Sequence, residues 1–167
     1  LIVEGDVWSF TPDQQEQIIV PDLHIVDPGN SGDPNQSDLG SVDYSFYISE
    51  TEITNEEYAA FLTATNKPEG SLNPRMQISL VSDGYYLADE GVEEDPVSYV
   101  SFWNAARFAN WLSSGDPQKG VYKIDVQDST DSIIARNEAE WQKGGVAVAS
   151  HDEWYKSAYY SGTDAGA

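Results

Sequence analysis

Three consecutive residues, Ser150, His151 and Asp152, have the side chains of a nucleophile, a base and an orienting carboxylate. Hydrolytic enzymes use this combination when the three groups form one hydrogen-bonded line. Neighbouring residues on one helical turn point in different directions, so these three cannot form that line. Glu153 follows Ser150 at the spacing of a capping box, which predicts that Ser150 begins a helix. We assign no catalytic residue here.

A single histidine, His24, lies near two acidic residues in the sequence, Asp22 and Asp27. Histidine and carboxylate are both metal ligands, but a lone histidine with no second one nearby is a poor metal site. The only other histidine of the chain is His151. A structural or surface role is therefore the interpretation for His24.

The stretch from Asp27 to Gly40 is rich in turn-forming residues and in side-chain oxygens. Calcium prefers such hard oxygen ligands. The spacing does not match an EF-hand loop, where glycine falls at the sixth position and glutamate at the twelfth. Turns formed by Asn, Asp and Gly explain the same residues. Calcium binding by this loop stays open, and the metal ligands stay unknown; the candidate ligands are Asp27, Asn30, Asp33, Asn35 and Asp38.

A second acidic group consists of Glu90, Glu93, Glu94 and Asp95. Paired carboxylates of this kind catalyse glycoside hydrolysis when they flank a bound sugar. No aromatic platform for a sugar is assigned to the same loop. The sequence therefore favours a solvated acidic turn.

The composition restricts the partners of the chain. It has 29 Asp and Glu against 8 Lys and Arg, a net charge of −21, and no cysteine. This charge repels nucleic acids and anionic membranes, so we exclude nucleic-acid binding. Without cysteine the chain has no disulfide, no thiolate nucleophile and no zinc-thiolate site. No apolar run approaches the roughly 18 residues of a membrane span.

Alternating apolar residues from Val42 to Ile48 predict a half-buried strand. The 167 residues fit one domain with one core. An apolar run at Ile18 to Val20 is expected to lead into the next strand, and a turn is expected over Asp128 to Asp131. Further strands are predicted at Leu23 to Val26, Ile78 to Val81, Tyr85 to Leu87 and Gly120 to Asp125.

Three helices are predicted to begin at Thr54, Ser101 and Ser150, each with a capping residue three positions before a polar side chain. Gly115 is expected to end the second helix. Its buried stripe is predicted to be Ala105, Phe108, Ala109 and Leu112, with Arg107 and Asn110 on the other face. In the third helix, Trp154 is expected to pack against Ala149, with Ala158 one turn further on.

Three aromatic-rich segments occur in one order along the chain. They are Tyr44 to Leu62 (YSFYISETEITNEEYAAFL), Val100 to Leu112 (VSFWNAARFANWL) and His151 to Tyr160 (HDEWYKSAYY). In this order they resemble the formylglycine-generating enzyme family, also called sulfatase-modifying factors, in its secreted bacterial form. Arg136 and Asn137 resemble a further run of the same family.

This resemblance implies an α+β fold of the C-type-lectin-like kind, with short capped helices, twisted antiparallel strands and extensive loops. Active members use a copper-bound cysteine pair, in the second half of the domain, and oxygen to convert a sulfatase cysteine to formylglycine. We expect residues 1–20 to be a peripheral segment and residues 21–167 to be part of the domain without the cysteine-bearing part. Copper and calcium are implied only for complete family members, so no cofactor is assigned to this chain.

Two functions of different class remain from these observations. In the first, the chain is the scaffold half of a formylglycine-generating enzyme and is inactive alone, with a sulfatase polypeptide as the partner of the parent protein. In the second, it is a non-catalytic lectin-like module that binds a protein or glycan. The related iron-dependent sulfoxide synthases need a histidine cluster that His24 and His151 cannot supply. The resemblance and the acidity imply a secreted, periplasmic or cell-surface protein; no oligomeric state is assigned.

Overall fold

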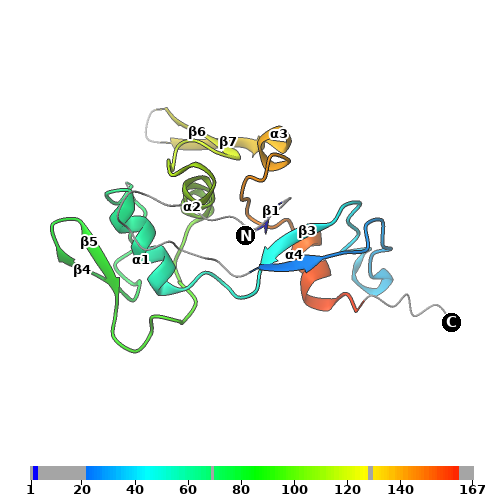
Figure 1. The fold of residues 1–167 in the computed structure, drawn as a ribbon, viewed down its shortest axis with the longest axis horizontal. Coiled ribbons are helices and arrows are strands. Elements are labelled where there is room, and N and C mark those ends of the chain that lie inside the picture. The colour runs from blue at the N-terminus through cyan, green and yellow to red at the C-terminus, as the bar shows by residue number, and fades with distance from the viewer. Residues whose placement is uncertain (1, 4–21, 69, 128–129, 162–167) are drawn as a thin grey trace.

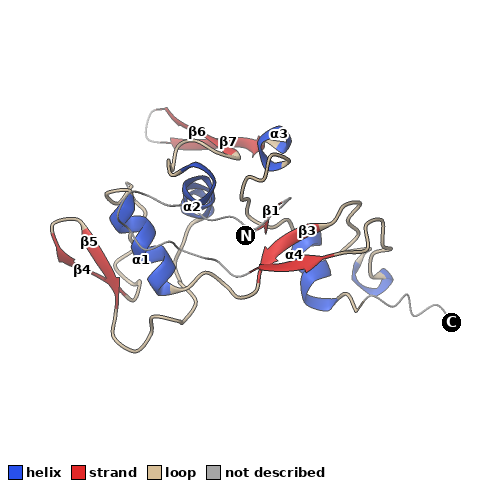
Figure 2. Cartoon of the chain, in the orientation of Figure 1, coloured by secondary structure: helices blue, strands red, loops and turns tan. Residues whose placement is uncertain are grey.

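A computed structural model describes residues 2–3, 22–68, 70–127 and 130–161 of the chain. Separate helices lie beside small antiparallel sheets, which confirms the predicted α+β class (Figure 2). The strands are β1 (Ile2–Val3), β2 (Asp22–Ile25), β3 (Phe46–Ser49), β4 (Ile78–Ser82), β5 (Tyr85–Ala88), β6 (Tyr122–Gln127) and β7 (Thr130–Arg136). The helices are the 3-10 turn η1 (Pro34–Gln36), α1 (Asn55–Ala64), α2 (Phe102–Ser114), α3 (Glu138–Trp141) and α4 (His151–Tyr159).

The strands form three sheets. β3 lies between β1 and β2, with Ile48 opposite both Ile2 and Leu23. The β4–β5 and β6–β7 hairpins are separate two-stranded sheets. The predicted strands at Leu23 to Val26, Ile78 to Val81, Tyr85 to Leu87 and Gly120 to Asp125 are confirmed within a few residues.

Two strand predictions need correction. The alternation from Val42 to Ile48 forms a strand only from Phe46, because the backbone at Val42 bonds instead to Gly29 and to the side chain of Asn30. In the expected turn at 128–131, the last two residues belong to β7 and lie opposite β6. The predicted run at Ile18 to Val20 lies outside the described residues, as does most of the expected N-terminal segment 1–20.

All three predicted helix starts are confirmed. Thr54 accepts a hydrogen bond from the Glu57 amide, and Glu57 accepts one from the Thr54 amide at 2.8 Å. Ser101 caps α2, and Gly115 ends it in the left-handed conformation, with φ of 78°. Ser150 and Glu153 form the second complete capping box. Local sequence therefore fixes where these helices begin.

The predicted helix faces are partly wrong. In α2, Arg107 and Asn110 are buried, whereas the sequence placed them on the other face. In α4, Trp154 is 50% exposed and Ala158 is exposed, so the face that carries them is not the buried face of this helix. Glu153 and Lys156 are the buried residues of α4. Their polar ends have partners from distant parts of the chain.

The core lies where α1 meets α2 (Figure 1). Rings from the two helices pack edge to face, tilted or stacked, with centroids 5.3 to 5.8 Å apart, the spacing favoured by aromatic pairs. The rings belong to Tyr58, Phe61, Phe108 and Trp111. The β4–β5 hairpin extends from one end of this core, and β2, β3 and α4 occupy the opposite end (Figure 1). None of the described helices is long and apolar enough to cross a bilayer.

Candidate functional site

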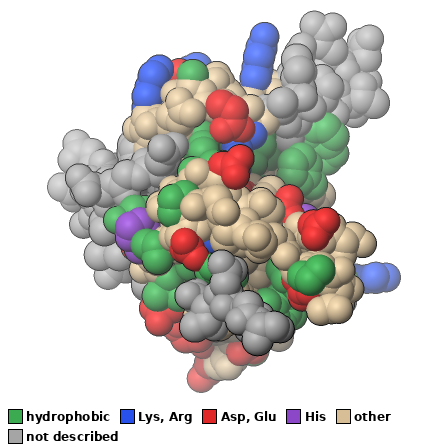
Figure 3. Space-filling view, turned by 90° about the vertical axis from the view of Figure 1, so that its right-hand side faces the viewer, with side chains coloured by type: hydrophobic (Ala, Val, Ile, Leu, Met, Phe, Trp, Pro, Cys, Tyr) green, Lys and Arg blue, Asp and Glu red, His purple; other side chains and the backbone are tan. Residues whose placement is uncertain are grey.

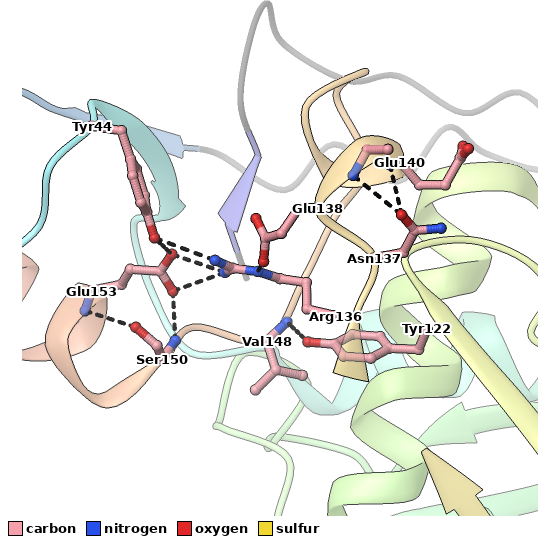
Figure 4. A network of polar contacts seen from close by, with 10 residues as sticks. Tyr44, Tyr122, Arg136, Asn137, Glu138, Glu140, Val148, Ser150 and Glu153 are labelled. Carbon is pink, nitrogen blue, oxygen red and sulfur yellow. Dashed lines mark hydrogen bonds and ion pairs between the residues drawn. The ribbon is translucent and has the colours of Figure 1, made fainter. Parts of the chain in front are cut away.

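A partly buried group of polar residues joins the end of β7, the start of α4 and the segment before β3 (Figure 4). Arg136, the last residue of β7, donates from one terminal nitrogen to both carboxylate oxygens of Glu153, at 2.9 and 3.2 Å. Tyr44 donates its hydroxyl to Glu153 at 2.6 Å. The other terminal nitrogen of Arg136 donates to the Tyr44 oxygen at 3.3 Å. We call Tyr44, Arg136 and Glu153 the polar triangle.

Surrounding residues fix the orientation of the polar triangle. The Nε of Arg136 donates to Glu138 at 2.8 Å, and the guanidinium lies 4.3 Å from the ring centroid of Trp141. Such stacking is typical of arginine on tryptophan. The second oxygen of Glu153 also accepts from the Ser150 amide at 2.6 Å, as part of the capping box. Glu153 therefore connects a helix terminus to an ion pair.

The protonation states follow from burial and hydrogen bonding. Burial, and then the hydrogen bond to Glu153, raises the pKa of Tyr44 to about 12. Burial alone would lower the pKa of Arg136, but hydrogen bonds to Glu138, Glu153 and Tyr44 outweigh it and raise that pKa. Near neutral pH Tyr44 is thus a neutral donor and Arg136 a cation. Neither group is suited to accept a proton in catalysis, because a general base needs a pKa near the working pH.

The structure separates the side chains of Ser150, His151 and Asp152. Ser150 caps the helix, and Asp152 accepts from the Gly40 amide at 2.9 Å. His151 is exposed. Ser150 and Asp152 therefore serve the start of α4 and its contact with the loop before β3.

The loop considered for calcium binding packs against α4. Asp33 accepts from the Asn35 amide at 2.8 Å and from the Tyr155 hydroxyl at 2.7 Å. Asp27 accepts from Tyr160 through its carboxylate and from Lys156 through its carbonyl, the latter at 2.7 Å.

Other residues of this loop also bond to protein atoms. Asn30 bonds through its side chain to Gly40 and Val42. Within the described ranges, no group of three or more His, Asp or Glu side chains is placed to hold a metal ion. Figure 3 shows acidic side chains at separate places on this end of the molecule.

The remaining candidates also have protein contacts. His24 is exposed and stacks on Tyr47 across β2 and β3, with ring centroids 4.4 Å apart. The acidic turn caps α1: the carbonyls of Glu93 and Asp95 accept from the first amides of the helix. The Asn55 side chain donates to the carbonyl of Val92, also in this turn. We assign no ligand to either place.

One hollow lies beside α2. Its volume is about 130 Å³, and it is lined by Ser113, Ser114, Gly120, Val121, Glu140, Lys143 and Gly145. Ligand pockets usually measure about 300 to 1,000 Å³. The hollow is therefore too small for a ligand of ordinary size.

Sequence reasoning missed the polar triangle and the role of Asn110. The Asn110 side chain is fully buried, donates to the Tyr122 carbonyl at 2.7 Å and accepts from the Tyr122 amide at 2.8 Å, so it holds β6 against α2. For the polar triangle, the sequence offered two separate signals. One was Arg136, directly after an apolar strand segment, and the other was Glu153, at the capping-box position of a helix. Neither signal identifies its partner.

The copper site of complete formylglycine-generating enzymes cannot be built from this chain. That site uses a cysteine pair, and the 167 residues contain no cysteine. The donor set does not fit copper-thiolate chemistry, so no step of that reaction is assigned to these residues.

Comparison with known proteins identifies the family. A family model described as the sulfatase-modifying factor enzyme 1-like domain matches residues 9–166. Searches of curated proteins and of solved structures gave no match. The match spans nearly the whole chain and includes all three aromatic segments, the polar triangle and the α1–α2 core. The chain therefore belongs to the formylglycine-generating enzyme, or sulfatase-modifying factor, family.

Proposed function

We propose that this chain is the scaffold half of a formylglycine-generating domain and that it has no oxidase activity alone. The family match carries this proposal, since it covers residues 9–166 of a chain that contains no cysteine. The polar triangle supports a scaffold role because it joins three separate elements through groups whose hydrogen bonds are used within the protein. The parent protein would oxidise a sulfatase cysteine, and its fold would be C-type-lectin-like.

A turnover assay tests both halves of this proposal. The purified 167-residue chain and the product of its complete coding region are each incubated with copper, oxygen and a cysteine-containing sulfatase peptide. Mass spectrometry then detects the aldehyde product. We expect product only from the complete protein. Product from the 167-residue chain, or a complete protein that has no cysteine pair, would contradict the proposal.

A non-catalytic binding module is the second candidate, and the exposed rings of α4 favour it. Trp154 is 50% exposed and Tyr159 is 64% exposed, with their centroids 5.9 Å apart. Exposed aromatic rings bind partners at low entropic cost because they have few rotatable bonds. A glycan array and a protein-capture screen with wild type and Trp154→Ala test this candidate. Binding that Trp154→Ala removes would support this candidate. Copper-dependent turnover by the complete protein, together with no bound glycan or protein in either screen, would reject it.

We also propose a secreted, periplasmic or cell-surface location. The net charge of −21 supports this, since extracellular salt screens the repulsion among surface carboxylates. Fractionation of cells that express the complete coding region tests it. Recovery of the protein only from the cytosol would contradict the proposal.

A further inference from the structure

The β4–β5 hairpin has one covered edge and one open edge. α1 packs against β5. The Thr63 hydroxyl accepts from the Tyr86 amide at 2.8 Å and donates to the Tyr86 carbonyl at 3.3 Å. The backbone groups of Tyr86 therefore point away from β4 and toward α1. This contact closes the outer edge of β5.

The pairing register shows where the backbone of β4 points. Leu80 lies opposite Tyr86 in the antiparallel ladder. In such a ladder, opposite residues exchange either both of their hydrogen bonds or neither. Because Tyr86 uses its groups on Thr63, the amide and carbonyl of Leu80 point to the free side of β4. In the described part of the chain, these two groups have no hydrogen-bond partner.

Apolar side chains accompany this open edge. Leu80 is 57% exposed and Val81 is 58% exposed, although Tyr86, opposite Leu80, is buried under α1. Proteins usually protect an edge strand with charge, proline or a covering element. In β4, the pairing register with β5 shifts between Leu80 and Ser82, and this irregularity protects part of the edge. It limits regular pairing to the segment from Ile78 to Leu80.

Charge identifies the kind of partner. Residues 76–98 contain six carboxylates and no Lys or Arg; the carboxylates are Asp83, Asp89, Glu90, Glu93, Glu94 and Asp95. The whole chain has a net charge of −21. Like charge disfavours a second copy at this edge, and a basic segment is attracted to it.

We propose that the open edge of β4 binds an extended, basic segment of another protein by strand addition. The partner strand accepts from the Leu80 amide, donates to the Leu80 carbonyl and covers the Leu80 side chain. Its Lys and Arg residues lie near the exposed carboxylates around the hairpin, such as Asp83 and Glu90. This binding does not depend on the function proposed above.

Titration of the 167-residue chain with a synthetic peptide tests the proposal. The probe is a peptide of about ten residues, the length of a long strand, in which lysine alternates with valine. Amide NMR shifts are expected at Ile78 and Leu80, and a glutamate-for-lysine peptide is expected not to bind. A lysine–valine peptide with alternate backbone amides methylated should bind about tenfold more weakly, because about two hydrogen bonds are lost.

Two variants with the same charge change provide the matched comparison. Leu80→Lys adds a cation to the open edge, whereas Val26→Lys adds one at another exposed apolar site, 56% exposed, after β2. We expect Leu80→Lys to weaken peptide binding about tenfold and Val26→Lys to leave it nearly unchanged. Circular dichroism spectra of both variants are compared with wild type to check that they fold.

Three outcomes would overturn the proposal. The first is equal binding by Leu80→Lys and Val26→Lys, and the second is equal binding of the methylated and unmethylated peptides. Either result would mean general attraction to an acidic surface. The third is sedimentation of the wild-type chain as a dimer with concentration-dependent shifts at Leu80, which would assign the edge to a second copy.

Discussion

At the scale of single residues, Glu153 is the fully buried member of the polar triangle. Its buried carboxylate accepts from Arg136, Tyr44 and the Ser150 amide. Glu153→Gln removes the charge partner of a largely buried arginine while nearly preserving shape. Breaking one side of a buried ion pair usually costs about 3 to 5 kcal/mol. We expect a loss of this size in the free energy of unfolding, measured by urea denaturation.

Glu138 provides the matched control for Glu153. It binds the same arginine at 2.8 Å, but its side chain is 55% exposed. Exposed ion pairs contribute roughly 0 to 1 kcal/mol because solvent screens them. Glu138→Gln should therefore change stability much less than Glu153→Gln. Equal losses in the two variants would contradict the role given to burial.

Asn110 carries a second expectation at this scale. Asn110→Ala leaves the amide and carbonyl of Tyr122 without their side-chain partner, and an unsatisfied buried group costs about 1 to 3 kcal/mol. We expect a loss of at least about 2 kcal/mol in urea unfolding. Asn35→Ala, at an exposed asparagine, is the control and should be nearly neutral. Similar values for the two variants would reject this role of Asn110.

Sequence could not reveal these residue contacts because the partners are distant along the chain. Tyr44 is 109 positions from Glu153 and 92 from Arg136. A capping glutamate and a strand-terminal arginine each satisfy a local rule without any partner. For Asn110, the helical spacing suggested a polar face, but β6 covers that face. Tertiary packing therefore decides which of these polar side chains are buried and which partners they bond to.

At the scale of elements, helix starts were predictable and helix faces were not. Thr54, Ser101 and Ser150 act through bonds to residues three positions away, which a sequence displays directly. The buried face of α4 depends instead on Arg136 and on the loop at Asp27. Glu153 and Lys156 are buried for that reason, and Trp154 is left exposed.

The contact between the η1 loop and α4 should depend on pH. The hydrogen bond from Tyr155, followed by that from the Asn35 amide, lowers the pKa of Asp33 below its ordinary value of 3.8. A carboxyl with a lowered folded-state pKa stabilises the protein above its unfolded-state pKa, and this contribution is lost as pH falls through the folded-state pKa. Asp33→Asn should therefore lower the melting temperature at pH 7. The difference from wild type should shrink below pH 3.8.

Tyr155→Phe tests the same contact from the other element. It removes the donor to Asp33 and keeps the ring. We expect the same pH dependence as for Asp33→Asn, and little further loss in the double variant, because both changes remove one interaction. A melting-temperature difference that does not shrink as the pH falls well below 3.8 would show that Asp33 acts only through packing.

At the scale of the whole molecule, the fold class and the family could be predicted, and the arrangement of sheets could not. Three aromatic-rich segments in one order resemble the family, and the family match over residues 9–166 confirms that resemblance. The placement of β3 between β1 and β2 was not predicted, since pairing partners in sheets are not encoded at fixed sequence spacing. The open edge of β4 is likewise visible only once its register with β5 is known.

The net charge of −21 leads to the final expectation. Mutual repulsion of carboxylates opposes the compact state, and salt screens it: the Debye length falls from about 10 Å at 0.1 M to about 3 Å at 1 M ionic strength. Salt weakens the buried Arg136–Glu153 pair less, because screening acts mainly on exposed charges. The melting temperature should therefore rise with NaCl and equally with KCl, since screening depends on ionic strength alone. Uncharged sucrose at equal osmolality is the control that separates charge screening from preferential exclusion of the solute. A melting temperature that decreases from 0.1 to 1 M NaCl would contradict the expectation and would mean that attractive ion pairs dominate the surface.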